Sequence, residues 1–184
     1  MRVISGYLKG RSLEGYNTIG TRPTMDRVKE SLFASIQDYT NNSIVLDLFC
    51  GSGSLGIEAI SMNAKYCYFV DNGKEILKHL NKNINNLNIN DKSIVINKDY
   101  KDALIYFKNN NIKFNIILVD APYKLELMEE VIELVNSYNL LFDGGLLVLE
   151  YSFDKLKDKY NNLILYKNKK YGDKYVNIYK KIVD

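Results

Sequence analysis

The stretch VLDLFCGSGSLGIEA, residues 45–59, joins a short apolar run to three glycines and a helix-forming segment. Gly51, Gly53 and Gly56 satisfy the spacing G-x-G-x-x-G, in which backbone N–H groups approach a ligand at the start of a helix. Asp47 stands in the strand just ahead of these glycines. Because a carboxylate repels a pyrophosphate and attracts an ammonium group, the pattern favours the amino acid end of S-adenosylmethionine over a dinucleotide.

Apolar runs alternate with amphipathic stretches on both sides of this motif. Five continuous apolar runs separated by helices predict a parallel sheet in a doubly wound α/β structure. The expected strands are SIVLDLF, YCYFVD, SIVIN, FNIILVD and GLLVLEY, and the expected helices cover residues 54–62, 73–87, 100–109 and 125–137. The last segment, LILYKNKKYGDKYVNIYKK, predicts an antiparallel hairpin. These elements predict a Rossmann-like class I methyltransferase fold with a seven-stranded, mostly parallel sheet.

Two later strands also end in acids, which extends the donor site. Asp71 is spaced to accept hydrogen bonds from ribose hydroxyls, although nicotinamide enzymes use an acid there too. Asp99 can accept from the adenine amino group while Ile96 or Tyr100 covers the ring. The predicted donor site is Asp47, Phe49, Gly51, Gly53, Gly56, Asp71, Asn72, Asp99 and Tyr100.

The fourth strand leads into Asp120, Ala121, Pro122 and Tyr123, at the sheet edge where α/β folds bind ligands. The exocyclic amine of a nucleobase is a poor nucleophile, and the Asp120 carboxylate and the Ala121 carbonyl can accept its two N–H bonds. Pro122 stiffens the loop, and Tyr123 offers a face on which an extruded base can stack. We therefore predict these four residues as the methyl-transfer site.

The first 27 residues contain all four arginines of the chain, Arg2, Arg11, Arg22 and Arg27. A guanidinium makes planar contacts with phosphates and bases that a lysine does not reproduce, so these arginines predict RNA binding. Chance clustering with intramolecular salt bridges is the alternative. We expect one domain over residues 1–184, in which residues 1–23 form a small β-hairpin for RNA contact. Residues 24–184 form the catalytic core, beginning with a helix from about 25 to 38.

Composition narrows the remaining possibilities. The chain has 184 residues, a net charge of +3 and 46% hydrophobic residues, which suits one globular domain. No apolar run is long enough to span a membrane, and no secretory signal is readable, so a cytoplasmic monomer is expected. Cys50 and Cys67 lack a C-x-x-C partner and the chain has one histidine, which predicts two buried thiols and no metal site.

The order MRVISGYLKGRSL, TRPTMDRVKESLF, VLDLFCGSGSLGIEA, DAPY and YGD resembles the RsmD family over nearly the whole chain. The resemblance implies methylation of N2 of a guanine in small-subunit 16S ribosomal RNA, on naked RNA or on an assembling subunit. It also implies donor contacts at Asp47, Gly51, Gly53, Asp71 and Asp99, acceptor contacts from Asp120 to Tyr123, and RNA contacts from the arginine segment. The family usually has a proline where this chain has Ala121.

Four alternatives remain open at this point. An adenine-N6 methyltransferase of DNA or RNA would use the same donor and chemistry, although no sizeable target-recognition region is visible. A protein-glutamine methyltransferase would more naturally carry Asn at position 120. An NAD-dependent oxidoreductase is disfavoured by Asp47, and a non-catalytic RNA-binding module would not need the series of acids.

Overall fold

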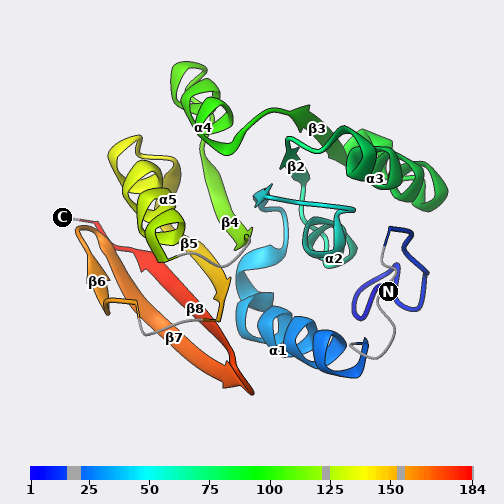
Figure 1. Cartoon of the computed structure of the whole chain (residues 1–184), viewed down its shortest axis with the longest axis horizontal. Helices are drawn as coiled ribbons and strands as arrows, with labels where there is room; N and C mark the ends of the chain where they lie inside the picture. Colours follow the sequence, from blue (N-terminus) through cyan, green and yellow to red (C-terminus); the bar gives the residue numbers. More distant parts are fainter. Residues whose placement is uncertain (16–21, 122–124, 153–155, 184) are drawn as a thin grey trace.

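The computed structural model describes residues 1–15, 22–121, 125–152 and 156–183, without the side chains of residues 22–24. One mixed sheet runs through this part of the chain in the order β3-β2-β1-β4-β5-β8-β7-β6 (Figure 1). Its strands are β1 (Ile44–Leu48), β2 (Tyr66–Asp71), β3 (Ser93–Asn97), β4 (Phe114–Asp120), β5 (Leu141–Tyr151), β6 (Lys159–Tyr160), β7 (Leu163–Tyr171) and β8 (Lys174–Lys181). Strands β1 to β5 are parallel, and β8 returns antiparallel to β5.

Helices cover both faces of the sheet. They are α1 (Arg22–Thr40), α2 (Ser54–Ser61), α3 (Lys74–Leu87), α4 (Tyr100–Asn109) and α5 (Leu125–Ser137), with a short 3-10 turn at Asn90–Lys92. The apolar sides of α1, α2 and α3 share one core with the sheet, and those of α4 and α5 share the other. This burial on both faces explains why the parallel strands are continuous apolar runs, and it confirms the predicted doubly wound α/β architecture.

The sheet has one strand more than the seven predicted. The additional strand, β6, is two residues long and pairs with β7 through Lys159↔Ile164 and Tyr160↔Leu163. The turn between them places Asn161 at a φ of 50°, a conformation that asparagine tolerates better than most residues. A two-residue strand has no periodicity to detect, so sequence patterning could not predict it.

Residues 1–15, which we call the N-terminal segment, fold back on themselves less regularly than the predicted hairpin. They contain a single antiparallel bridge, Arg2↔Ser12, supported by hydrogen bonds from Val3 N to Arg11 O and from Leu13 N to Met1 O. Helix α1 begins at Arg22, earlier than predicted, and buries Val28 and its helical neighbours in the core.

The order of strands reverses between β1 and β4, because the chain leaves β1 in one direction towards β2 and β3 and in the other towards β4 and β5. Ligands of open α/β sheets bind at such a switch point, beyond the carboxyl ends of the strands. Within the described residues, no helix has the length and apolar character needed to cross a bilayer. Cys50 and Cys67 are buried free thiols, as predicted.

Candidate functional site

A cavity of about 170 Å³ lies at the switch point and brings part of the predicted donor site together with Asp120 of the predicted acceptor site. Asp47 and Gly51 line it from the glycine loop side, and Asp120 lines it from the end of β4. The complete lining is Met1, Met25, Val28, Lys29, Asp47, Phe49, Cys50, Gly51, Ser54, Leu55, Asp120, Glu150 and Lys174. Residues far apart in the sequence therefore share one site.

Asp47 is the most deeply buried acid of this cavity. Its side chain is held by the N–H of Gly56, which donates to Oδ2 at 2.8 Å, and the residue is only 2% exposed. Burial raises the pKa of Asp47 to about 7, with Asp120 and Asp71 adding repulsion and the Gly56 hydrogen bond opposing it. A buried carboxylate of this kind gains most from a cationic ligand, since the ligand's charge offsets the cost of desolvation.

The raised pKa of Asp47 predicts how the free energy of unfolding changes with pH. The pKa of Asp47 is about 7 in the folded protein and 3.8 in the unfolded chain, so the folded protein favours the protonated, neutral side chain. The contribution of Asp47 to stability is therefore fully present below about pH 4, and it is lost as pH rises through about 7 and the buried side chain becomes charged. Asp47→Asn keeps an acceptor for Gly56 and removes the charge. We expect the variant to exceed the wild type in free energy of unfolding by about 1–3 kcal/mol at about pH 8, with little difference below about pH 4.

Urea unfolding of both proteins across this pH range measures the difference. Asp143→Asn, an exposed aspartate paired with Lys181, is the control and should show no comparable trend. A variant that is less stable than the wild type at high pH would show that the carboxylate is net favourable there.

A second, smaller hollow of about 30 Å³ brings together four more of the predicted donor residues, Asp71, Asn72, Asp99 and Tyr100. Its other lining residues are Phe49, Val70 and Lys98, whereas Gly53 and Gly56 line neither cavity. Asp71 accepts hydrogen bonds from Gly51 N at Oδ2 (2.9 Å) and from Gly73 N at Oδ1 (2.8 Å), which fixes its carboxylate. Asp99 is the N-cap residue of α4, and its side chain accepts a hydrogen bond from Lys101 N at 3.0 Å. Both acids therefore support backbone turns and also face a hollow.

Phe49 has an unusual backbone conformation for a large side chain, with a φ of 64°. Such left-handed conformations are costly for bulky residues and cluster at ligand sites. The conformation sets the Phe49 ring against that of Tyr100, with centroids 5.2 Å apart. Tyr100 in turn donates from its hydroxyl to Glu130 Oε2 at 2.6 Å. The aromatic pair lies between the small hollow and the larger cavity, since Phe49 lines both.

The three glycines of the motif have different structural roles. Gly51 lines the larger cavity, whereas Gly53 has a φ of 93° and precedes the first residue of α2. Gly56 packs against β2 so closely that an added Cβ would lie 2.3 Å from the Phe69 ring. Direct cofactor contact stays a prediction for all three, and for Gly56 the structure shows a packing requirement as well.

The acceptor end of the site contains Asp120 and Ala121 at the end of β4, while Pro122 and Tyr123 lie outside the described residues. The pKa of Asp120 rises to about 7, first through burial and then through the negative charge of Glu150, and Lys174 opposes this rise. Glu150 is opposite Asp120 in the pairing of β4 with β5, and Lys174 donates to Glu150 Oε1 at 2.6 Å.

Sequence reasoning missed Glu150 and Lys174. Glu150 closes an apolar strand and Lys174 begins the last one, so neither belongs to a glycine or acid motif. The one signal in the sequence is that each is a charged residue near the end of a largely buried strand. The acids that were predicted show the same signal, but Glu150 and Lys174 lack a neighbouring motif.

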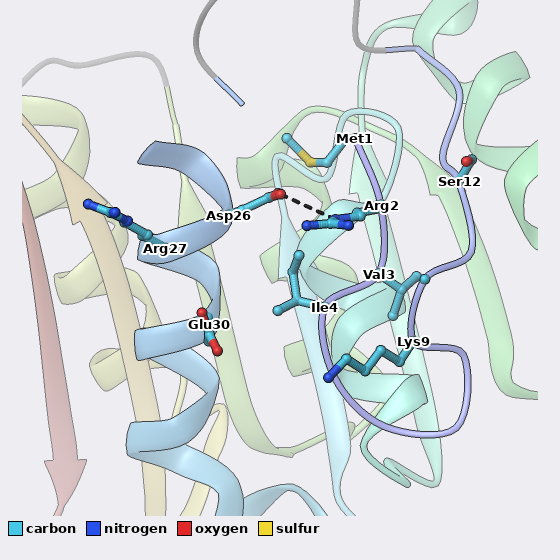
Figure 2. A pocket seen from close by; sticks show the side chains of 10 residues that line it. Met1, Arg2, Val3, Ile4, Lys9, Ser12, Asp26, Arg27 and Glu30 are labelled. Carbon is cyan, nitrogen blue, oxygen red and sulfur yellow. Dashed lines mark ion pairs between the residues drawn. The ribbon is translucent and has the colours of Figure 1, made fainter. Parts of the chain in front are cut away.

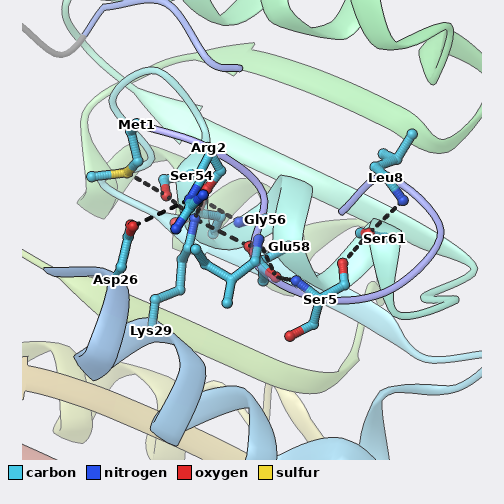
Figure 3. A network of polar contacts seen from close by, with 12 residues as sticks. Met1, Arg2, Ser5, Leu8, Asp26, Lys29, Ser54, Gly56, Glu58 and Ser61 are labelled. Atoms are coloured by element: carbon cyan, nitrogen blue, oxygen red, sulfur yellow. Dashed lines mark hydrogen bonds and ion pairs between the residues drawn. The ribbon is translucent and has the colours of Figure 1, made fainter. Parts of the chain in front are cut away.

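A buried ion pair attaches the N-terminal segment to the catalytic core (Figure 3). Lys29 of α1 and Glu58 of α2 are 3.1 Å apart, with side chains 4% and 1% exposed. Glu58 accepts hydrogen bonds from Ile4 N and Ser5 N, and Lys29 donates to Arg2 O at 2.7 Å. The pair therefore fixes the N-terminal segment against both helices.

A groove of about 790 Å³ runs between this segment and α1, as Figure 2 shows. Arg2, Lys9 and Arg27 contribute positive charge to it, and Asp26 and Glu30 contribute negative charge. Arg2 pairs with Asp26 at 3.5 Å, so the alternative of intramolecular pairing is realised for this arginine.

The other two arginines differ in their positions. The Arg11 guanidinium donates to Asn86 O at 2.7 Å, which directs it to the end of α3 and not into the groove. The side chain of Arg22 lies outside the described part of the structure. No group of three or more acidic, histidine or cysteine side chains suited to a metal occurs among the described residues.

Comparison with known proteins places this geometry in a family. The chain matches the family described as "Conserved hypothetical protein 95" over residues 1–180. It is 37% identical to the "Putative rRNA methyltransferase YlbH" of Bacillus subtilis, covering 98% of this chain and 99% of that protein. It is also 37% identical to the Ribosomal RNA small subunit methyltransferase D of Haemophilus influenzae, covering 94% and 89%.

A solved structure agrees with this assignment. The "Putative methyltransferase yhhF from Escherichia coli" superposes with a TM-score of 0.88 at 29% identity, covering 100% of this chain and 99% of that one. The match in sequence spans both the N-terminal segment and the glycine loop, and the match in structure spans the whole sheet. The chain belongs to the conserved hypothetical protein 95 family, which is the RsmD family of methyltransferases.

Proposed function

We propose that this chain transfers a methyl group from S-adenosylmethionine to N2 of a guanine in small-subunit 16S ribosomal RNA. The observation that carries the proposal is the single cavity in which Asp47, beside the glycine loop, and Asp120, at the end of β4, lie together. Family membership supports the same reaction class. The site would act in the cytoplasm, where the RNA is made and assembled.

The residues of the donor side suit the parts of S-adenosylmethionine. Asp47 would bind the ammonium group, Asp71 the ribose hydroxyls, and Asp99 the adenine amino group. The hollow beside Phe49 and Tyr100, at about 30 Å³, is smaller than a purine. We therefore expect the two rings to separate when adenine enters.

The acceptor side would work by positioning and charge. S-adenosylmethionine supplies an electrophilic methyl group on a sulfonium. The Asp120 carboxylate and the Ala121 carbonyl would accept the two N–H bonds of the guanine amine and direct its lone pair to that methyl group. As the N–C bond forms and the C–S bond breaks, Asp120 would accept the proton that the amine must lose.

Arg2 and Arg27 would bind phosphates of the RNA along the groove. We expect Arg27→Gln to weaken RNA binding at low salt and to reduce the slope of log K against log salt by about 0.7–0.9, the contribution of one phosphate contact. Donor affinity should stay unchanged. Lys65→Gln, an exposed cation just before β2 that does not line the groove, is the matched control. Equal losses of RNA affinity in Arg27→Gln and Lys65→Gln would indicate an effect of total charge and not a contact made by Arg27.

The proposed reaction is tested by incubating the protein with labelled S-adenosylmethionine and unmodified small-subunit RNA, offered naked and as particles. Nucleoside digestion and mass analysis should identify N2-methylguanosine. N6-methyladenosine, or label in DNA or protein only, would contradict the proposal.

A further inference from the structure

We propose that Glu150 and Lys174 read the Watson–Crick edge of the target base and make the site selective for guanine over other amine-bearing bases. This inference rests on the function proposed above, and it concerns two residues to which the proposed donor and transfer steps assign no contact with substrate or cofactor. It follows from where the ion pair lies and from what its two charges can bind.

The pair belongs to the same cavity as the transfer site. Glu150 and Lys174 both line the cavity that contains Asp120. Glu150 is opposite Asp120 across β4 and β5, and the side chains of laterally paired residues in a sheet project to the same side. Lys174 lies on β8, the next strand of the sheet, and is directed at Glu150. From β4 to β8 the charged groups are therefore the Asp120 carboxylate, the Glu150 carboxylate and the Lys174 ammonium.

A guanine presents a matching order of groups. Along its Watson–Crick edge lie the N2 amine, which donates, the N1–H, which donates, and O6, which accepts. With N2 on Asp120, the N1–H would meet the Glu150 carboxylate, and O6 would meet the Lys174 ammonium, which has three N–H donors. Flipped bases are commonly read by hydrogen bonds along this edge.

An adenine would meet the same side chains unfavourably. If its N6 amine occupied Asp120, its N1 would present a lone pair to the Glu150 carboxylate, and no oxygen would lie opposite Lys174. Two acceptors with no hydrogen between them repel each other in a buried site, while the Glu150–Lys174 pair itself stays intact, so the arrangement disfavours the wrong base as well as binding the right one. The pair is sufficiently enclosed for this effect, since the Glu150 side chain is 9% exposed and that of Lys174 is 26% exposed.

The test uses 2-aminopurine, which keeps the reacting amine but has a lone pair at N1 and no O6. Small-subunit RNA is ligated from a transcript and a synthetic oligonucleotide that carries guanine or 2-aminopurine at the methylated position. We expect the wild type to methylate guanine about 100-fold more efficiently, measured as kcat/KM. Glu150→Gln should lower kcat/KM for the guanine substrate by about 10–100-fold and kcat/KM for the 2-aminopurine substrate much less. The ratio of the two kcat/KM values should therefore become smaller than in the wild type.

Controls separate base reading from a structural role. Lys181 pairs with Asp143 at 3.2 Å between the same two strands, and Lys181→Gln should leave the guanine to 2-aminopurine ratio unchanged. If Glu150→Gln fails to fold, the double variant Glu150→Gln with Lys174→Gln keeps a neutral hydrogen-bonding pair and should narrow the ratio likewise. Thermal unfolding and donor binding check that each variant is folded.

The outcomes distinguish this inference from the proposed function. N2-methylguanosine formation with an unchanged ratio in the folded Glu150 and Lys174 variants would overturn the inference and leave the proposed function standing. If the wild type makes no N2-methylguanosine, both fall together.

Discussion

Replacing Asp120 by alanine is expected to lower the rate of methyl transfer by about 10³-fold, the loss that follows removal of a positioned proton acceptor. The variant should bind S-adenosylmethionine and RNA with affinities close to those of the wild type, because Asp120 would contact only the amine of the acceptor base. Single-turnover transfer of labelled methyl, alongside separate binding measurements for the two ligands, distinguishes a chemical defect from a binding defect. Unchanged methylation would remove Asp120 from the mechanism.

Asp120→Asn is the matched variant, since it keeps the size of the side chain and one acceptor oxygen. We expect an intermediate loss of about 10²-fold, because the amide cannot accept the proton. The pKa of Asp120, raised to about 7 by burial and by Glu150, adds a pH signature. The carboxylate is the active form, so the wild-type rate at saturating S-adenosylmethionine should fall as pH drops through about 7. The residual rate of the asparagine variant should lack this inflection.

The elements of the fold were accessible from sequence because each repeats a strong local pattern. The two-face burial of β1 and β4 makes them continuous apolar runs, and the helices between them have clear periodicity. The final hairpin was predictable from its turn at Gly172, whose φ is 62°. The two-residue β6 lacks such a pattern, and it is where the predicted number of strands differed from the structure.

The residues of the site likewise include some that the sequence predicted and some that it did not. The acids Asp47, Asp71 and Asp120 were predicted because each lies within or at the end of a recognisable strand. Glu150 and Lys174 are 24 residues apart and become neighbours only when β8 pairs with β5, so their relationship exists in the sheet and not in the sequence. The partition of the arginines, with Arg2 and Arg27 at the groove and Arg11 at α3, likewise depends on tertiary packing.

Replacing Lys29 by methionine is expected to lower the free energy of unfolding by about 3–5 kcal/mol, the usual cost of removing one partner from a buried ion pair. The Glu58 carboxylate would then be buried without its cation, held only by the N–H groups of Ile4 and Ser5. The exposed pair Lys78–Glu75, with N and O atoms 2.7 Å apart, is the control, and Lys78→Met should change the free energy of unfolding far less than Lys29→Met does. Urea unfolding measures both variants.

Adding Glu58→Gln to Lys29→Met should restore part of the lost stability, because the glutamine oxygen can still accept from Ile4 N and no unpaired charge remains. If the double variant is less stable than Lys29→Met alone, the carboxylate stabilises the fold without its lysine. Hydrogen exchange at the amides of Ile4 and Ser5 provides a local readout. Faster exchange there in Lys29→Met would show that the ion pair holds the N-terminal segment in place. Because that segment forms one wall of the groove, RNA binding should weaken together with it.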